Sequence, residues 1–387
     1  MSNLVLSASV RQNLLSLQST ADLLSTTQNR LATGKKVNTA LDNPTNFFTA
    51  QSLDNRASDI NNLLDGIGNG VQVLQAANTG ITSLQKLVDT AKSIANQVLQ
   101  SPVGYTTRST VSSAAALGGT AANLVDATTI KSGDVLSVAA SAGQPAFTFT
   151  FGASNSLAQL NASLAASNLT ASLDSSNKLV ITTTNDAASS TIGAVTLSTG
   201  GGTATFGTAT APVADQASQS ARAGLVAQYN NTIAQITTTA QDASFNGVNL
   251  LNGDSLKLTF NETGKSTLSI TGVTFGASGL GLGSLTSGTD FLDNNSANKV
   301  LTALGSASST LRSEASTLGS NLSVVQIRQD FSKNLINVLQ TGSSNLTLAD
   351  TNEEAANSQA LSTRQSIAVS ALALANQSQQ SVLQLLR

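Results

Sequence analysis

Apolar side chains recur at alternating spacings of four and three residues near both ends of the chain. The first series is Val10, Leu14, Leu17, Ala21, Leu24, Gln28 and Leu31, and the second is Ala368, Leu372, Ala375, Gln379, Val382 and Leu386. A helix with such a heptad stripe buries it against another helix, so we expect the two ends to pair. Because a short helix with one apolar face is marginal alone, ends without a partner would pack with neighbouring copies. Periodicity alone, however, favours an ordinary bundle within one chain.

Helical patterns continue inward from both ends. The first helix ends near Gly34, which suits a C-cap, and a second begins at Pro44 with Asn43 as its N-cap. Four glycines lie inside this second helix: Gly66, Gly68, Gly70 and Gly80. Each costs about 1 kcal/mol relative to Ala in a helix. We therefore expect the helix to depend on packing, with closely approaching neighbours as one explanation for the glycines.

Three further helices and a hairpin are predicted in the second half of the chain. The first helix carries the stripe Ala217, Ala221, Leu225, Tyr229, Ile233, Ile236 and Ala240. The segment FNGVNLLNG at 245–253 follows and contains two Asn-Gly turn signals. Residues 256–260 and 267–270 read as a hairpin, and residues 300–339 as a long helix. The last helix opens at Asp350, with Glu353 in a capping-box position.

The middle of the chain, residues 105–212, is β-rich. Strand-like runs are predicted at 135–138, 147–151, 179–184, 194–197 and 203–206, with a short helix at 157–166. We therefore predict an α+β fold in which long coiled-coil-like helices from both ends pack together around a hairpin and a β-rich outer insert. The predicted divisions are 1–43 with 345–387, 44–104 with 213–344, and 105–212.

Composition argues against most catalytic chemistry. The chain has no histidine and no cysteine, so the usual zinc ligand sets and most nucleophilic triads are impossible. No phosphate-binding loop or paired carboxylate stands out, and we expect no enzyme activity, metal or cofactor. The net charge of −2 and pI near 5.1 give no basic surface for nucleic acid. No apolar run of about 18 residues exists, and no secretory signal peptide is visible, so a membrane-spanning segment is not expected.

Three motifs resemble those of bacterial flagellins. RLATGKKVN at 30–38, followed by the run Ala40 to Pro44, resembles their N-terminal signature. FNGVNLLNG is similar to their Phe-Asn-Gly turn. The end of the chain, ANQSQQSVLQLLR at 375–387, is similar to their terminal Ala-Asn-Gln and Leu-Leu-Arg motifs. The insert resembles, more weakly, a β-β-α-β-β module of outer flagellar regions. It precedes the helix that leads into the Phe-Asn-Gly turn, whereas in enteric-type flagellins the variable region follows the hairpin.

The resemblance implies a structural subunit that self-assembles into an extracellular flagellar filament for swimming and is exported by the flagellar type III pathway. Its implied partners are further copies of itself, an export chaperone at the C-terminal helix, and the filament cap and hook–filament junction proteins. A hook–filament junction protein, or a secreted adhesin with a coiled-coil stalk, are the alternatives. The expected polymerisation interface comprises Val10, Leu14, Leu17, Leu24, Arg30, Leu31, Lys35, Leu372, Ala375, Val382 and Leu386.

One segment lies where some flagellins contact an innate immune receptor through a Leu-Gln-Arg-Val-Arg-Glu stretch. Its residues here are Gln85, Lys86, Val88 and Asp89. Lys86 and Val88 replace the two arginines, and valine cannot make a bidentate arginine contact. We therefore expect a degenerate receptor site with weak or absent activation.

Overall fold

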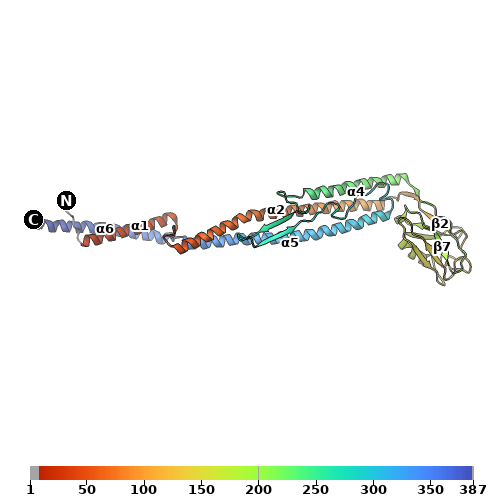
Figure 1. Ribbon diagram of the computed structural model, residues 1–387, viewed down its shortest axis with the longest axis horizontal. Helices are drawn as coiled ribbons and strands as arrows, with labels where there is room; N and C mark the ends of the chain where they lie inside the picture. Colours follow the sequence, from red (N-terminus) through yellow and green to blue (C-terminus); the bar gives the residue numbers. More distant parts are fainter. Residues whose placement is uncertain (1–7, 199, 386–387) are drawn as a thin grey trace. The chain divides into compact units, whose positions relative to one another are not determined.

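The computed structural model describes residues 8–198 and 200–385. Five long helices dominate it: α1 (Ala8–Thr33), α2 (Pro44–Gln100), α4 (Gln216–Asp242), α5 (Asn294–Thr347) and α6 (Thr351–Leu385) (Figure 1). A β-rich region lies between α2 and α4, and β9 (Ser255–Thr259) pairs with β10 (Thr267–Thr271). The predicted α+β fold, with helices from both chain ends packed together, is confirmed.

The chain divides into two compact units. The terminal unit holds residues 1–69, 257–268 and 324–387, and the central unit holds residues 70–256 and 269–323. In the terminal unit, Ala57 and Ile60 of α2 pack with Ile336 and Leu339 of α5. In the central unit, α2 buries a continuous stripe of apolar side chains: Leu74, Ala77, Ile81, Leu84, Val88, Ala91, Ala95 and Val98. The three-part division of the chain made from the sequence stays a prediction.

Local signals at the helix ends act as the sequence predicts. The backbone N–H of Asn46 donates to Asn43 Oδ1 at 3.0 Å, so Asn43 caps α2. The N–H groups of Asn352 and Glu353 donate to Asp350 Oδ1, so Asp350 caps α6. Gly34 follows α1 with φ of +67°, a left-handed conformation that glycine adopts without steric cost.

The β-rich region contains two three-stranded antiparallel sheets. One has the order β2 (Thr110–Ser112), β6 (Leu179–Thr183), β5 (Leu169–Leu173), and the other β4 (Phe147–Thr150), β3 (Val135–Val138), β7 (Val195–Ser198). The sheets and α3 (Leu157–Leu164) share one apolar core. A two-stranded neck, β1 (Tyr105–Thr107) with β8 (Val213–Ala214), joins this region to α2 and α4. The strand predicted at 203–206 is wrong: only Phe206 forms an isolated bridge, to Ser113.

Gly80 is a glycine whose missing side chain is explained by packing. A Cβ built on it would lie 2.6 Å from both Ala243 Cβ and Leu251 Cδ1. A Cβ on Gly66 would meet nothing within 4 Å. The sequence-based expectation of close neighbours therefore holds at Gly80, and Gly66 has no such neighbour among the described residues.

We expect Gly80→Ala to lower the free energy of unfolding by about 1–3 kcal/mol, because the added methyl group overpacks the contact with Ala243 and Leu251. Gly66→Ala is the matched control and should raise stability by up to about 1 kcal/mol through helix propensity alone. Urea unfolding followed by circular dichroism measures both. Equal stability of the two variants would contradict the packing explanation.

Candidate functional site

The segment that connects α1 to α2 lies beside the segment that connects α5 to α6. The Lys36 N–H donates to the Thr347 carbonyl at 2.8 Å, and the Ala349 N–H donates to the Gly34 carbonyl at 3.0 Å. Lys35 and Leu348 form an antiparallel bridge between these segments. We call residues 34–37 and 347–349 the joint. The motif RLATGKKVN thus contains residues 34–37 of the joint. Asp350, which caps α6, follows directly after residues 347–349.

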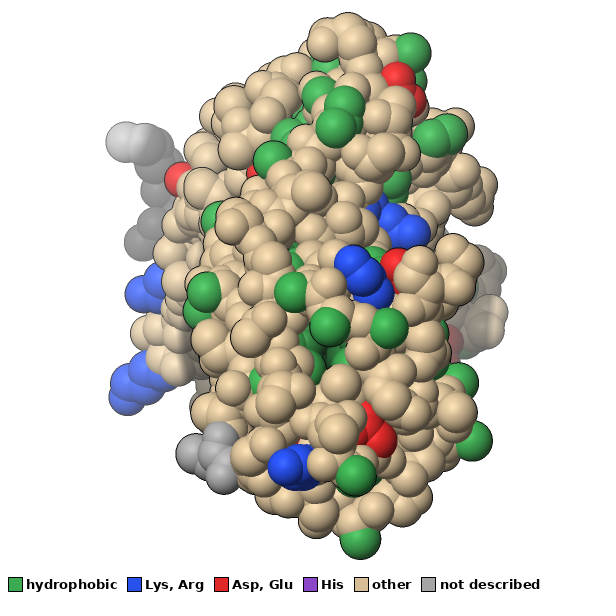
Figure 2. Space-filling view, turned by 90° about the vertical axis from the view of Figure 1, so that its right-hand side faces the viewer, with side chains coloured by type: hydrophobic (Ala, Val, Ile, Leu, Met, Phe, Trp, Pro, Cys, Tyr) green, Lys and Arg blue, Asp and Glu red, His purple; other side chains and the backbone are tan. Residues whose placement is uncertain are grey.

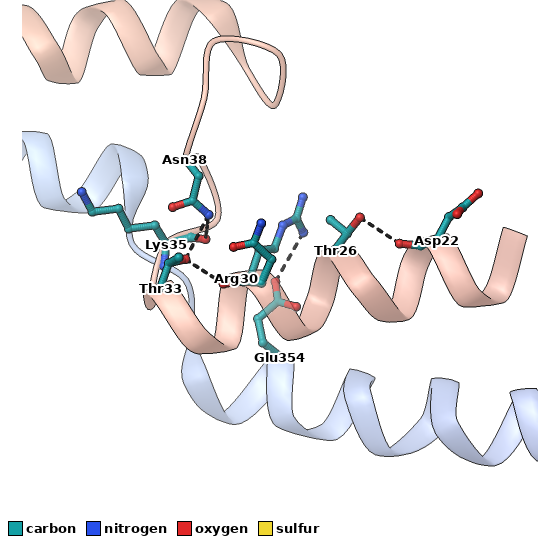
Figure 3. Close-up of polar contacts among 8 residues, drawn as sticks. Asp22, Thr26, Arg30, Thr33, Lys35, Asn38 and Glu354 are labelled. Atoms are coloured by element: carbon teal, nitrogen blue, oxygen red, sulfur yellow. Dashed lines mark hydrogen bonds and ion pairs between the residues drawn. The ribbon is translucent and has the colours of Figure 1, made fainter.

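An ion pair lies next to the joint and connects α1 to α6 (Figure 3). Arg30 Nη1 lies 3.4 Å from Glu354 Oε1, and Glu354 is only 8% exposed. Arg30 Nε and Glu354 Oε2 are buried without a hydrogen-bond partner. At the C-terminal end of α1, Asn38 Nδ2 donates to Thr33 Oγ1 at 3.0 Å and to the Lys35 carbonyl at 3.2 Å. Arg30 therefore connects the two terminal helices through this ion pair.

The two terminal helices lie side by side, as the heptad stripes predict (Figure 1). On α1, Val10 is buried, Leu17 and Leu24 are half-buried, and Thr20 and Thr27 are 4% and 7% exposed. On α6, the half-buried side chains are Ser358, Leu361, Gln365, Ala368, Leu372 and Ala375. The seam between α1 and α6 therefore mixes large apolar side chains with small and polar ones.

Several of the largest apolar side chains of both terminal helices lie outside this seam. On α1 these are Leu14, Leu15, Leu23 and Leu31, and on α6 they are Ile367, Val369 and Leu374. Leu14 and Leu31 are 46% and 39% exposed, so the predicted stripe is only partly buried within the chain. The assignment of its residues to a polymerisation interface stays a prediction. The side chain of Val382 and the whole of Leu386 lie outside the described residues.

A further exposed apolar stripe on α5 was not predicted from the sequence. Its members are Val324, Ile327, Phe331 and Val338, at spacings of three, four and seven residues. The heptad spacing of these residues was available in the sequence. It was hidden by the stronger inward stripe of the same helix, which includes Val325, Ile336 and Leu339.

The FNGVNLLNG segment forms a tight turn that closes the C-terminus of α4. Phe245 and Val248 exchange backbone hydrogen bonds at 3.0 Å, and Asn246 and Gly247 both have positive φ. Asn249 is buried, and its Nδ2 donates to the carbonyls of Ala240 and Gln241 at 2.8 Å each. The motif therefore satisfies carbonyl groups left free at the end of α4.

The predicted receptor segment lies on α2 in the central unit. Val88 is buried in the core, Gln85 is half-buried, and Lys86 and Asp89 are exposed. A buried valine is not available to a receptor in the isolated chain, which agrees with the expected weak site. Receptor activation itself stays a prediction.

Two kinds of feature are absent from the part of the chain that the structure describes. Among residues 8–198 and 200–385, no cluster of three or more His, Cys, Asp or Glu side chains could hold a metal ion. Within the same residues, no helix is long and apolar enough to cross a bilayer. On the face drawn in Figure 2, hydrophobic side chains are dispersed among polar ones, and the few charged side chains are of both signs.

Comparison with known families accounts for both ends of the chain. The family model of the bacterial flagellin N-terminal helical region matches residues 2–137, and that of the C-terminal helical region matches residues 301–386. Together they cover more than half of the chain. The chain belongs to the bacterial flagellin family. The joint, the α1–α6 seam and the outward leucines all lie within these two matched regions of the flagellin chain.

Individual relatives agree with this assignment. The chain is 33% identical to flagellin FljM of Caulobacter vibrioides over 165 residues, which is 42% of this chain and 59% of that protein. It is 32% identical to flagellin FljK of the same organism over the same shares. Flagellin A of Rhizobium meliloti is 35% identical over 88 residues, 23% of this chain and 22% of that protein. The chain thus spans about three fifths of the length of the Caulobacter flagellins it matches.

Proposed function

We propose that this flagellin is a structural subunit that self-assembles into a flagellar filament for swimming. The observation that carries the proposal is that α1 exposes leucines on its outer face although its inner face toward α6 is partly polar. The face toward α6 buries Thr20 and Thr27, whereas Leu15 and Leu23 on the outer face are 63% and 52% exposed. A helix that exists only to fold its own chain would bury its leucines first. The outer face therefore fits packing against other copies.

The energetics support the same conclusion. Fully burying one Leu side chain contributes about 1.5–3 kcal/mol. The outward residues of α1, α6 and α5 supply several such side chains per subunit. Heterologous contacts between unlike surfaces on successive copies generate open helical polymers when the rotation does not close. Arg30 and Lys35 hold the joint between the terminal helices, so we propose that they act by fixing the surface that neighbouring copies meet.

The partners and location follow from the proposed function. We propose an extracellular filament location, export by the flagellar type III pathway, a chaperone that holds the C-terminal helix, and contacts with the filament cap and junction proteins. We propose no catalytic role, and no nucleic-acid or membrane partner. The relatives reported above are named flagellins, which favours a filament subunit over the junction-protein and adhesin alternatives.

Seeded polymerisation tests the proposal. Purified full-length chain should elongate onto filament seeds, measured by sedimentation and electron microscopy. Removing residues 351–387, which include α6, should abolish elongation, because the seam and its outward apolar residues are lost.

The β-rich region of the truncated chain serves as a control for folding. The β-rich region has a core of its own, so it should keep its thermal unfolding transition after truncation. Elongation by the truncated chain at the wild-type rate would refute the assembly role of the terminal helices.

A further inference from the structure

The loop between α1 and α2 presents Leu41 to solvent. Leu41 is 96% exposed, the highest value among the large apolar side chains of the described residues. The loop is held by Asp42, whose Oδ2 accepts from the N–H groups of Asn38 at 2.9 Å and Thr39 at 2.8 Å. The Asp42 N–H donates back to the Thr39 carbonyl at 3.2 Å. A rigidly presented apolar side chain has the properties of a binding anchor, because little conformational entropy is lost when it is buried.

A groove lies beside the joint in the same terminal unit. Its volume is about 540 Å³, and it lies among the joint, the first turns of α2 and the last turns of α5. Four lining residues, Val37, Phe47, Ala50 and Leu348, are apolar. The other eight are polar or charged, so the apolar part of the groove is limited. The groove is large enough for an apolar side chain such as leucine together with the backbone that carries it.

Leu41 of the same chain does not occupy this groove, which leaves the groove open to the Leu41 side chain of another copy. The hydrogen bonds of Asp42 hold Leu41 of the same chain out in solvent, so that side chain does not fill its own groove. Charge also bears on a contact between copies. Hydrogen bonds from the Thr39 and Asn38 backbone hold the pKa of Asp42 below its usual value, so the residue after Leu41 is an anion at neutral pH. Lys35 and Asp54 both line the groove, so an incoming carboxylate would be attracted by Lys35 and repelled by Asp54.

We propose that Leu41 of one copy docks into the groove beside the joint of the next copy, with Asp42 facing Lys35. The contact joins two different surfaces, so it is heterologous and extends into an open polymer. It rests on the proposed function, because it names the contact by which the subunits of one filament recognise each other.

Disulfide trapping tests this contact directly. The chain has no cysteine, so every disulfide in a variant is an introduced one. Filaments of the double variant Leu41→Cys with Ser344→Cys, where Ser344 lines the groove, should give a ladder of covalent oligomers on a non-reducing denaturing gel after mild oxidation. Each single variant, and a control pairing Leu41→Cys with Ser93→Cys on the exposed face of α2, should give no ladder. A disulfide closed within one chain, or equal ladders from both pairs, would overturn the contact.

A second variant separates this contact from the proposed function. Leu41→Asp should leave thermal unfolding of the monomer unchanged, because the side chain is exposed. It should raise the critical concentration for polymerisation about tenfold or more. If the wild type polymerises and Leu41→Asp does so equally well, the docking contact fails while the filament function stands. If the wild type itself does not elongate on seeds, both fail.

Discussion

Arg222→Met should lower the free energy of unfolding of the helical part of the central unit by about 3–5 kcal/mol. Arg222 is 1% exposed and lies on α4. Its guanidinium donates to the carbonyls of Pro102 and Phe291 at 2.7 Å each, and to three further acceptors: the Val98 and Ser101 carbonyls and Asn294 Oδ1. Methionine fills a similar volume but leaves all five acceptors without this donor.

The positions of these acceptors explain why the effect should be large. They come from the end of α2, the turn before the β-rich neck, and the start of α5. Burial lowers the pKa of Arg222, and the nearby Asp293 opposes this shift. An arginine guanidinium stays protonated in proteins, so this buried side chain carries its charge. One charged side chain thus connects the segments from which the insert emerges.

Urea unfolding followed by circular dichroism measures the loss. Arg222→Lys is the informative second variant, because a lysine has three donors and cannot reproduce the planar guanidinium, and it should lose most of the same stability. Arg312→Met is the matched control, since Arg312 is exposed and donates only to Ser308 Oγ. A loss below about 1 kcal/mol for Arg222→Met would contradict the role of Arg222 as a central hydrogen-bond donor.

The burial of Arg222 could not be predicted from the sequence. The stripe predicted on this helix included Ala221 and Leu225, and the structure instead buries Arg222 and Val226. From Tyr229 to Ala240 the predicted stripe is confirmed. An arginine is normally placed on the surface, and no local signal indicates that five acceptors from two distant segments, residues 98–102 and 291–294, will converge on it. That information lies in the tertiary arrangement.

Signals that act over a few residues were predicted well. Asn43, Asp350 and Gly34 mark helix ends through their own hydrogen bonds or φ values. The missed strand β5 alternates buried and exposed side chains, so its pattern was available in the sequence. The missed strands β1 and β8 have the opposite character. β1 and β8 are short, and their partners are about 100 residues apart in the sequence. Their existence depends on pairing rather than on an alternating pattern, so periodicity could not reveal them.

The orientation of α1 could be predicted only in part, because the helix carries two overlapping stripes. Val10, Leu17 and Leu24 belong to both stripes. One stripe adds Leu14 and Ala21 between them, and the other adds Asn13 and Thr20. The sequence favours the stripe with more apolar side chains, whereas α6 packs on the one with Thr20. Hydrophobicity identifies apolar faces and does not say which partner covers each of them.

The outward leucines give the second large expected effect. Leu15→Ser with Leu23→Ser should raise the critical concentration for polymerisation more than about 100-fold, because burying two Leu side chains is worth about 3–6 kcal/mol. Both residues border one shallow groove on the exposed face of α1. Sedimentation of seeded reactions at a series of chain concentrations measures the change.

A control pair keeps this prediction specific to assembly. Gln12→Ser with Gln28→Ser changes two other exposed positions of α1 and carries a similar helix-propensity cost of a few tenths of a kcal/mol each. Both double variants should show the same thermal unfolding as the wild type, since none of these side chains is buried in the monomer. Only the leucine pair should lose polymerisation. If both pairs polymerised like the wild type, the outer face of α1 would not be a subunit interface, and the partly polar seam with α6 would need another explanation.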